Sequence, residues 1–267
     1  MADEEGNEVD DDRVRDIIES SLVVLGAGAG TAVGGPWAGA ALSEAARRVG
    51  LEVYDRLLVW RQRMRVGATL GYMAADAEEL ANQGALRRGD GFFNQDETGR
   101  SAADELCEAV LLSAADSFQE KKLRHLGAIL PAASVRVDVA AADALWICRV
   151  VDRLSWRQLT LIALLLNPPT DQLVLRDVQK DEGRERRASG AFMSEVEELT
   201  VYGLLDVLDA NGEPQATGQT WGTISGIWGA GTARWTLSRE GRLLSELSRL
   251  DDVAPPDLAR VTEELLS

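Results

Sequence analysis

Residues 101–166 read SAADELCEAVLLSAADSFQEKKLRHLGAILPAASVRVDVAAADALWICRVVDRLSWRQLTLIALLL, and this stretch decides the fold. Ser101 and Asp104 have the spacing of a capping box, in which each side chain accepts a hydrogen bond from the other residue's backbone amide. The apolar residues of this part recur every three or four positions; they are Ala103, Leu106, Cys107, Val110, Leu111, Ala114 and Phe118. This periodicity predicts a helix over 101–118 with one buried face.

Two further helices are predicted in the second half of the stretch. Asp138 is placed to cap the first of them. The apolar positions of that helix are Ala144, Ile147, Val151 and Leu154. Ser155 and Gln158 form a second capping box, and the helix behind it ends at the Asn-Pro-Pro run 167–169, because proline lacks an amide hydrogen. We expect these three helices to form the core.

Length, composition and charge indicate an ordinary globular protein. The 267 residues are 45% hydrophobic and 27% charged, which is enough apolar content for a core that needs no disulfide or metal. The net charge is -16, and the first nineteen residues hold nine acidic and two basic side chains. Such a run predicts a disordered acidic tail over 1–19. An acidic surface repels nucleic acid and anionic lipid, so neither is expected as a general partner.

The cysteines and the N-terminal residues bear on the cellular compartment. Cys107 and Cys148 fall on apolar helical faces, where an unpaired thiol behaves as a small hydrophobic group, as is usual in a reducing cytoplasm. The chain begins with carboxylates, whereas a secretory signal begins with basic residues. We therefore expect a cytoplasmic protein, with membrane association left open by the segment that follows the tail.

The segment 20–43 contains no charged residue. Its candidate helix-packing or membrane strip consists of Gly26, Gly30, Gly34, Gly35, Gly39 and Trp37. A turn at 34–36 (Gly-Gly-Pro) divides the segment into arms shorter than the ~20 residues that span a bilayer, which favours a helical hairpin. We expect the hairpin to pack on the helical core through Leu22, Val23, Leu25, Val33 and Trp37. The alternatives are a membrane-active effector that inserts this segment when the acidic tail moves, and a homo-oligomer.

From Trp37 to about Gly84 the spacing predicts one long amphipathic helix. Its apolar positions are Leu42, Ala46, Val49, Val53, Leu57, Trp60, Met64 and Ala68. The opposite face is rich in arginine, which we interpret as ion pairs with the tail or with carboxylates of neighbouring helices. Contact with phosphate or lipid headgroups is the functional alternative. A loop follows over 87–99 and carries Phe92 and Phe93.

Beyond Pro169 the pattern changes to a mixture of helices and strands. The expected elements are a short helix around Leu173, Val174 and Val178, a helix over 189–202 ending at Gly203, strands over 204–208 and 233–237, a helix capped by Ser238, and a last helix over 257–266 after Pro255 and Pro256. A Gly-rich loop, 212–231, joins the two strands. Together with the helix over 155–166, this is the order of a winged helix.

The fold class predicted from these elements is mostly α, with an N-terminal helical bundle followed by a winged-helix-like α+β unit that has a two-stranded wing. The expected divisions are an acidic tail over 1–19, a Gly/Ala-rich helical hairpin over 20–43, a helical core over 44–154, the winged-helix-like unit over 155–250 and a C-terminal helix over 251–267.

Residues able to carry catalysis or hold a metal are few. The single histidine, His125, follows Arg124 and lies near Lys122, so we interpret it as an exposed or half-buried helix residue with lowered basicity. The two cysteines and His125 lack the spacing of zinc ligands. The glycines of 26–30 lack the Gly-Lys-Ser/Thr that closes a phosphate loop. We expect no enzyme activity, no cofactor and no metal.

The remaining candidates are binding residues in the C-terminal half. Trp221 and Trp228 lie in the Gly-rich loop and are candidate partner contacts, although the loop can equally pack on its own domain. Candidate anion contacts precede the helix over 189–202; they are Arg184, Arg186 and Arg187. That helix itself carries Glu195, Glu197 and Glu198, which disfavours binding of DNA through it. A protein is the expected partner.

The run 101–130, with Glu-Lys-Lys-Leu at 120–123, and the run Leu-Ser-Trp-Arg-Gln-Leu at 154–159 resemble a family of uncharacterised bacterial helical proteins. They are more distantly similar to the Abi-alpha type associated with phage abortive infection. The resemblance covers roughly residues 37–250 in layout, and its motifs are those of packing and capping. It implies an interaction or sensor module in phage defence or a stress response, and it assigns no functional residue.

Overall fold

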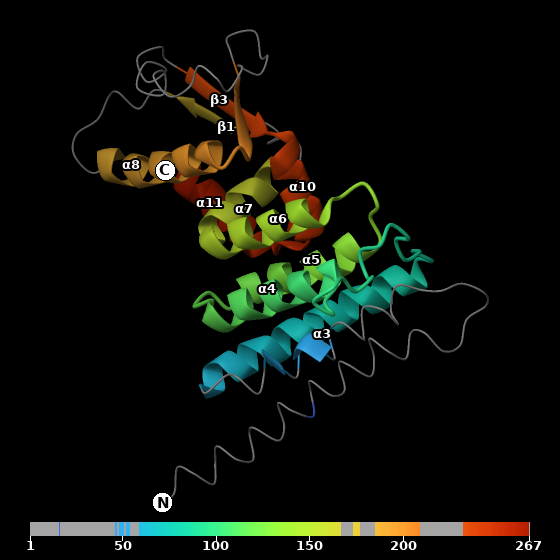
Figure 1. Cartoon of the computed structure of the whole chain (residues 1–267). Helices are drawn as coiled ribbons and strands as arrows, with labels where there is room; N and C mark the ends of the chain where they lie inside the picture. The colour runs from blue at the N-terminus through green and yellow to red at the C-terminus, as the bar shows by residue number, and fades with distance from the viewer. Residues whose placement is uncertain are drawn as a thin grey trace, which may run out of the picture. The chain divides into compact units, whose positions relative to one another are not determined.

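The computed structural model describes residues 16, 46, 48–50, 52–53, 59–166, 173–176, 185–208 and 232–266 (Figure 1). Over these residues the chain is mostly helical with a small antiparallel sheet, which confirms the predicted fold class. The predicted tail, apart from Asp16, and the predicted hairpin over 20–43 lie outside the described residues. The chain divides into two compact units, of which the first comprises Met1–Leu154 with Leu247–Arg249 and the second comprises Ser155–Glu246 with Leu250–Ser267.

The described part of the first unit is a bundle of helices. They are α3 (Trp60–Asn82), α4 (Ala102–Asp116), α5 (Lys122–Ser134) and α6 (Ala141–Arg153). α4 and α5 both pack on α3, and α6 packs on α4 and α5 (Figure 1). At Gly127 on α5, a Cβ atom would lie 3.0 Å from the carbonyl oxygen of Thr69 and 3.1 Å from Cβ of Tyr72. The backbones of α3 and α5 therefore approach this closely because position 127 has no side chain.

α4 begins at the predicted capping box but ends two residues earlier than predicted. The backbone amide of Asp104 donates to Ser101 Oγ at 3.2 Å, and that of Ser101 donates to Asp104 Oδ2 at 2.8 Å, which confirms the capping box. Phe118, predicted on the buried face, is 84% exposed. That prediction was wrong because the helix ends at Asp116 and extended backbone at Ser117 changes the direction of the chain.

α6 starts three residues later than the predicted cap. Asp138 does not cap it, because the helix begins at Ala141 behind Ala140, and Asp138 Oδ2 instead accepts from Arg136 Nη2 at 2.6 Å. The predicted apolar face is nevertheless buried, as Ile147 and Val151 show. An aspartate near the start of a helix can accept a hydrogen bond either from a backbone amide of the helix or from a basic side chain. Here Arg136, two residues away, provides the stronger, charge-assisted bond.

The helix predicted over 37–84 is interrupted. Val59 has extended backbone (φ −103°, ψ 123°), and α3 begins only at Trp60. Before the interruption, the predicted apolar positions Ala46, Val49 and Val53 are helical and buried. Beyond it, the predicted positions Trp60, Met64 and Ala68 are exposed, and the buried positions are Val66, Leu70, Met73 and Ala77. The prediction was wrong for α3 because a break in the backbone restarts the helical phase.

The loop between α3 and α4 carries Phe92 and Phe93 as predicted, and it is anchored by a buried arginine. Arg88 donates to both carboxylate oxygens of Asp90, at 2.8 and 2.5 Å, and to the carbonyl oxygen of Ala133 on α5 at 3.1 Å. Its guanidinium carbon lies 4.6 Å from the centroid of the buried Phe92 ring. The loop is thereby attached to the C-terminal end of α5.

The ion pair of this loop predicts a pH dependence of stability. The hydrogen bond from Arg88 lowers the pKa of Asp90 to about 2, below its ordinary value, so the pair stabilises the folded state above the ordinary carboxyl pKa and loses this effect as the pH falls toward 2. We expect Asp90→Asn to be less stable than wild type at about pH 6, with the difference shrinking as the pH falls below about 4. Urea unfolding over this range measures it. Glu97→Gln, in the same loop, is the control, and a difference that does not change with pH would contradict the prediction.

The second unit combines helices with a three-stranded sheet. Its helices are α7 (Trp156–Leu166), α8 (Glu185–Val201), α10 (Arg239–Leu247, whose last residue belongs to the first unit), the short η2 (Leu250–Asp252) and α11 (Pro255–Leu266). Its strands are β1 (Leu173–Arg176), β2 (Leu205–Leu208) and β3 (Thr232–Leu237). The strand order is β1-β3-β2, with every pair antiparallel.

The sheet contains the predicted wing and one strand more. β2 and β3 form the two-stranded wing, in which Leu205 pairs with Leu237. β1 pairs with the other edge of β3, with Leu173 opposite Trp235. The short helix predicted around Leu173, Val174 and Val178 was therefore wrong, since so few apolar residues do not distinguish a helix from a strand and pairing with β3 decides the outcome.

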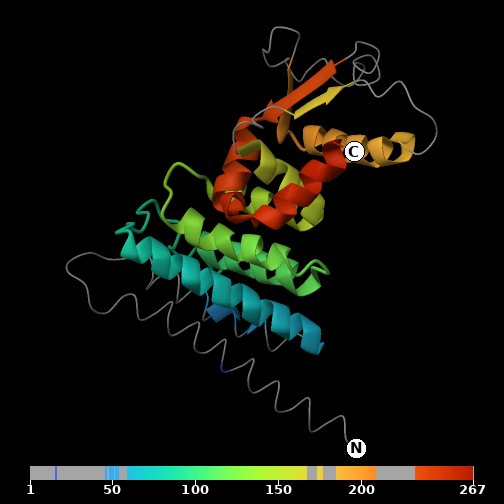
Figure 2. The same ribbon diagram turned by 180° about the vertical axis from the view of Figure 1, so that it is seen from behind.

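Local capping signals of the second unit are confirmed. The amide of Ser155 donates to Gln158 Oε1 at 2.8 Å and the amide of Gln158 donates to Ser155 Oγ at 3.1 Å, which is the predicted capping box of α7. Ser238 Oγ accepts from the amide of Gly241 at 2.9 Å and so caps α10. α8 ends at Val201, and the predicted Gly203 follows it with a φ of 71°. α11, with two prolines in its first turn, packs on α7 (Figure 2).

Candidate functional site

Most binding residues singled out in the sequence lie outside the described residues. These are Gly26, Gly30, Gly34, Gly35, Trp37, Gly39, Arg184, Trp221 and Trp228. Arg186 and Arg187 lie in the first turn of α8, because this helix begins at Glu185 and not at 189 as predicted, and their side chains are outside the described part. The roles assigned to all these residues stay predictions.

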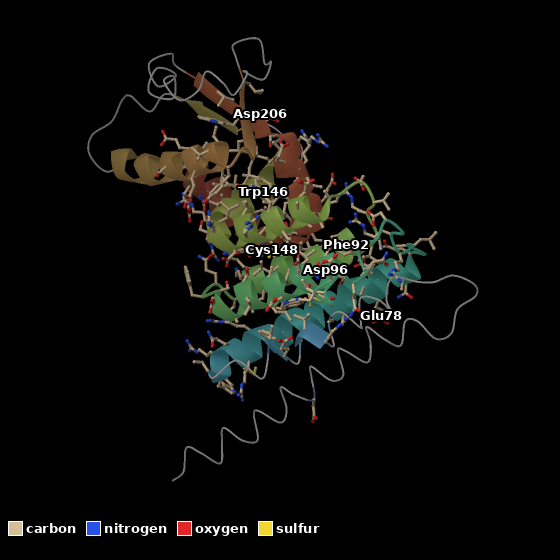
Figure 3. All side chains as sticks on the ribbon, viewed as in Figure 1. Glu78, Phe92, Asp96, Trp146, Cys148 and Asp206 are labelled. Atoms are coloured by element: carbon tan, nitrogen blue, oxygen red, sulfur yellow. The ribbon has the colours of Figure 1, made fainter. Side chains whose placement is uncertain are left out.

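The two cysteines are buried and unpaired, as predicted. Burial raises the pKa of both thiols, Cys107 and Cys148, to about 12. The thiols are therefore protonated at neutral pH, and a protonated thiol is neither a good nucleophile nor a metal ligand. Figure 3 shows Cys148 among the helices of the first unit. Among the described residues, no group of three His, Cys, Asp or Glu side chains is arranged to hold a metal ion.

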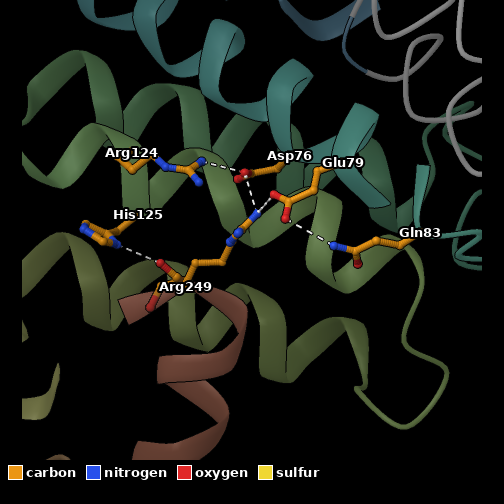
Figure 4. Close-up of polar contacts among 7 residues, drawn as sticks. Asp76, Glu79, Gln83, Arg124, His125 and Arg249 are labelled. Carbon is orange, nitrogen blue, oxygen red and sulfur yellow. Dashed lines mark hydrogen bonds and ion pairs between the residues drawn. The ribbon is translucent and has the colours of Figure 1, made fainter. Parts of the chain in front are cut away.

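His125 is buried, at 3% exposure, so the prediction of an exposed or half-buried residue was wrong. Its Nδ1 lies 2.8 Å from the carbonyl oxygen of Ser248 (Figure 4). A carbonyl oxygen only accepts, so Nδ1 carries the hydrogen and donates it. The imidazole thus binds backbone 123 positions away in the chain, and no local sequence signal could have shown this.

A buried aspartate on α3 binds two arginines that are distant in sequence (Figure 4). Arg124 Nη1 donates to Asp76 Oδ1 at 2.6 Å, and Arg249 Nη1 donates to the same oxygen at 3.0 Å. Arg249 also binds Glu79, one turn further along α3. The backbone of Arg249 has a φ of 51°, in the left-handed region that non-glycine residues seldom adopt, so these contacts hold it in an unfavourable conformation. We name Asp76, Glu79, Arg124 and Arg249 the α3 polar cluster.

The α3 polar cluster joins segments of the first unit. Residues Leu247–Arg249 belong to this unit, and they are bound through His125 and through Asp76. Burial raises the pKa of Asp76, and this effect outweighs the opposing hydrogen bond and charge of Arg124. The hydrogen bond from Arg249 lowers the pKa of the more exposed Glu79. Because these carboxylates are occupied by arginines, we assign the cluster a structural role.

The opposite pKa shifts predict opposite pH slopes for two substitutions that each remove a contact of Arg249. Because the pKa of Asp76 is raised in the folded protein, wild-type stability falls as the pH rises from the ordinary carboxyl pKa through the raised value. Asp76→Asn lacks this titration, so its stability relative to wild type should improve as the pH rises above about 4.

Glu79→Gln is the matched variant. The pKa of Glu79 is lowered, so wild type gains stability as the pH rises to the ordinary carboxyl pKa, and this variant should become less stable relative to wild type over that rise. Urea unfolding at several pH values between about 3 and 7 measures both slopes. Equal pH slopes for the two variants would contradict the opposite pKa shifts of Asp76 and Glu79.

An exposed apolar row runs along α3 beside its buried residues, and its Tyr72 borders α5 at Gly127. It consists of Trp60, Met64, Ala68, Tyr72 and Ala75, which we name the α3 stripe. At three or four residues apart, these positions fall within an arc of ~120° of the helix. Trp60, Met64 and Tyr72 are 37%, 38% and 40% exposed. The sequence predicted Trp60, Met64 and Ala68 as one row but assigned them to the buried face. That assignment was wrong because the helix is broken at Val59.

Comparison with known proteins finds no matching family model, no matching curated protein and no matching solved structure. In the part of the chain that the structure describes, no helix combines the length and the hydropathy needed to cross a bilayer.

Proposed function

We propose that this chain is a non-enzymatic protein-interaction or sensor module of the bacterial cytoplasm, and that it binds an apolar helix of a partner protein through the α3 stripe. The exposed row on α3 is the observation that carries the proposal. Three large apolar side chains in line, each more than a third exposed, form a patch of the kind that marks interaction sites. A setting in phage defence or a stress response rests on the resemblance of residues 101–130 and 154–159 alone.

The shape of the α3 stripe favours a helical partner. From Trp60 to Ala75 it extends ~22 Å along a straight helix axis. The small residue Ala68 leaves room between Met64 and Tyr72, and Ala75 leaves room beyond Tyr72. Such gaps receive the side chains of a second helix. Amphipathic helices bind in this way through apolar residues three and four positions apart.

Two of the arginines predicted to form ion pairs with neighbouring carboxylates do so. Arg65 Nε lies 2.9 Å from Glu120 Oε1, and Arg48 lies 3.5 Å from Asp104 Oδ1. These two arginines therefore form ion pairs with carboxylates of the bundle, in agreement with the interpretation from the sequence. Arg61 is exposed at the edge of the stripe and suits an acidic residue at the edge of a partner helix.

The proposal is tested by site-specific photocrosslinking in the full-length chain. A photoreactive residue in place of Ala68 should capture a partner, and the same residue in place of Val137, exposed in the loop before α6, should not. With the purified partner, Trp60→Asp should weaken binding roughly 30-fold, as expected for loss of a large aromatic contact. Isothermal titration calorimetry measures this.

Leu112→Asp is the matched control, because Leu112 is an exposed apolar residue on a different helix, α4. It should leave the affinity unchanged. Capture of the same proteins from positions 68 and 137, or equal weakening by Trp60→Asp and Leu112→Asp, would contradict the proposal.

A second candidate function, binding of duplex DNA, is favoured by the order α7, β1, α8, β2, β3 of the second unit and opposed by its charge. In α8, Glu195 lies 3.3 Å from Arg157, and Glu198 accepts from Gln158 at 2.8 Å. Beyond Arg187, the sequence of α8 contains no lysine or arginine. Basic residues on the recognition helix are expected to supply phosphate contacts, so DNA is the weaker candidate.

We therefore expect binding of mixed-sequence duplex DNA to be no tighter than the non-specific range of roughly 10⁻⁴–10⁻⁶ M at physiological salt. Fluorescence anisotropy of a labelled duplex measures it. Tighter, salt-dependent binding that is lost when Arg184, Arg186 and Arg187 are replaced by alanine would favour DNA over protein as the partner.

A further inference from the structure

We infer that the helix bound by the α3 stripe is α3 of a second copy of this chain, in the antiparallel orientation. The inference rests on the proposed function, because it uses the same surface and names the partner. It predicts a homodimer whose two-fold axis passes the α3 stripe at the height of Leu70 along the helix.

The sizes of the exposed residues on α3 are complementary to their own reversed order. The large residues are Met64 and Tyr72, and the small ones are Ala68 and Ala75. In two antiparallel copies centred on Leu70, Tyr72 of each copy faces Ala68 of the other, because both lie two residues from the centre. Met64 faces Ala75 in the same way, since they lie six and five residues from it. Each large side chain therefore meets a small one, as in helices whose ridges and grooves interlock.

The charges of α3 follow the same reversal. Its first six residues carry three basic and no acidic side chains, and residues 76–79 carry three acidic and no basic ones. Arg61, Glu78 (Figure 3) and Glu79 are exposed. They lie eight or nine residues from the centre, so the antiparallel arrangement brings each Arg61 to the two carboxylates of the other copy. The dimer forms this contact twice, and opposite charges at an interface fix the orientation of the partners.

A parallel arrangement of two copies lacks both kinds of complementarity. It places Met64 against Met64 and Tyr72 against Tyr72, with a gap where the two Ala68 residues meet. It also places the basic end of each helix against the basic end of the other, and it aligns the two helix dipoles. The pattern on α3 therefore selects an antiparallel second copy.

The central aromatic residue of this surface is held in place before a partner binds. The guanidinium carbon of Arg124 on α5 lies 5.7 Å from the centroid of the Tyr72 ring. A side chain that is already ordered loses little conformational freedom on association, so more of its contact energy is available for binding.

The size of the contact sets the expected affinity. Two helices that touch over ~22 Å bury an area at or below the lower end of the ~1,200–2,000 Å² that stable interfaces bury. The net charge of -16 on each chain opposes association, although physiological salt screens charges that lie more than ~8 Å apart. We therefore expect a dimer that dissociates in the micromolar range.

Sedimentation velocity of the full-length chain tests the inference. Between ~1 and ~100 μM the wild-type chain should pass from the mass of one chain to that of two. Ala68→Glu should raise the dissociation constant at least about tenfold, because it places a carboxylate against Tyr72 of the other copy at both contacts. A wild-type chain that stays monomeric over this range would overturn the inference.

Ala142→Glu is the matched control, because Ala142 is an exposed alanine on a different helix, α6, and the change in charge is the same. It should leave the dissociation constant unchanged. Equal weakening by Ala68→Glu and Ala142→Glu would show that the copies associate through another surface, which overturns the inference.

Exchange of the two charges tests the antiparallel orientation. Arg61→Glu and Glu78→Arg should each raise the dissociation constant roughly fivefold, because each brings like charges together. The two substitutions in one chain restore opposite charges across the interface, so the double variant should lie within about twofold of wild type. Such recovery also shows that the single variants are folded. A double variant as weak as the single ones would overturn the antiparallel arrangement.

The inference and the proposed function fail in different ways. With a photoreactive residue in place of Ala68, the purified chain alone should give a linked product of twice its mass. If the purified chain is monomeric and position 68 captures a different protein in cells, the inference is wrong and the proposed function stands. If position 68 captures neither a second copy nor another protein, both are wrong.

Discussion

The close contact between α3 and α5 at Gly127 determines which face of α3 is buried. The absence of a side chain at this position lets the two backbones approach, and the buried positions of α3 then point toward α4 and α5. The same rotation of α3 places Asp76 within reach of Arg124, three residues before Gly127 on α5. It also leaves Trp60, Met64 and Ala68 of the α3 stripe exposed. Packing at one glycine thus sets both the α3 polar cluster and the candidate interaction surface.

Features that depend on neighbouring residues could be predicted from the sequence, and features that depend on distant ones could not. The capping boxes at Ser101 and Ser155 each need only residues three positions apart, and both are confirmed. Asp138 failed as a cap because Arg136 competes for its carboxylate. β1 was missed because its conformation depends on pairing with β3, more than fifty residues further along the chain. The burial of His125 depends on Ser248 in the same way.

The candidate surface shows how a correct periodicity leads to a wrong assignment. The apolar spacing of Trp60, Met64 and Ala68 is visible in the sequence, and as one uninterrupted helix it continues the buried face of Ala46, Val49 and Val53. Extended backbone at Val59 separates the two parts, and no glycine or proline marks this break. The buried face of the helix therefore changes at Val59, a residue that gives no sign of a break in the sequence. As a result, the apolar row assigned to the core lies at the surface.

The reactive groups of the described residues serve the structure, whereas the α3 stripe needs another explanation. Both thiols are protonated, His125 donates to a backbone carbonyl, and Asp76 is bound by arginines. The exposed apolar row, in contrast, forgoes ~25 cal/mol for each Å² left in water, and patches of this kind promote unwanted association. A partner helix that covers the row removes both costs, because it takes the apolar side chains out of water and leaves them unavailable for other contacts. An exposed apolar row on α3 is thus better explained by binding than by stability.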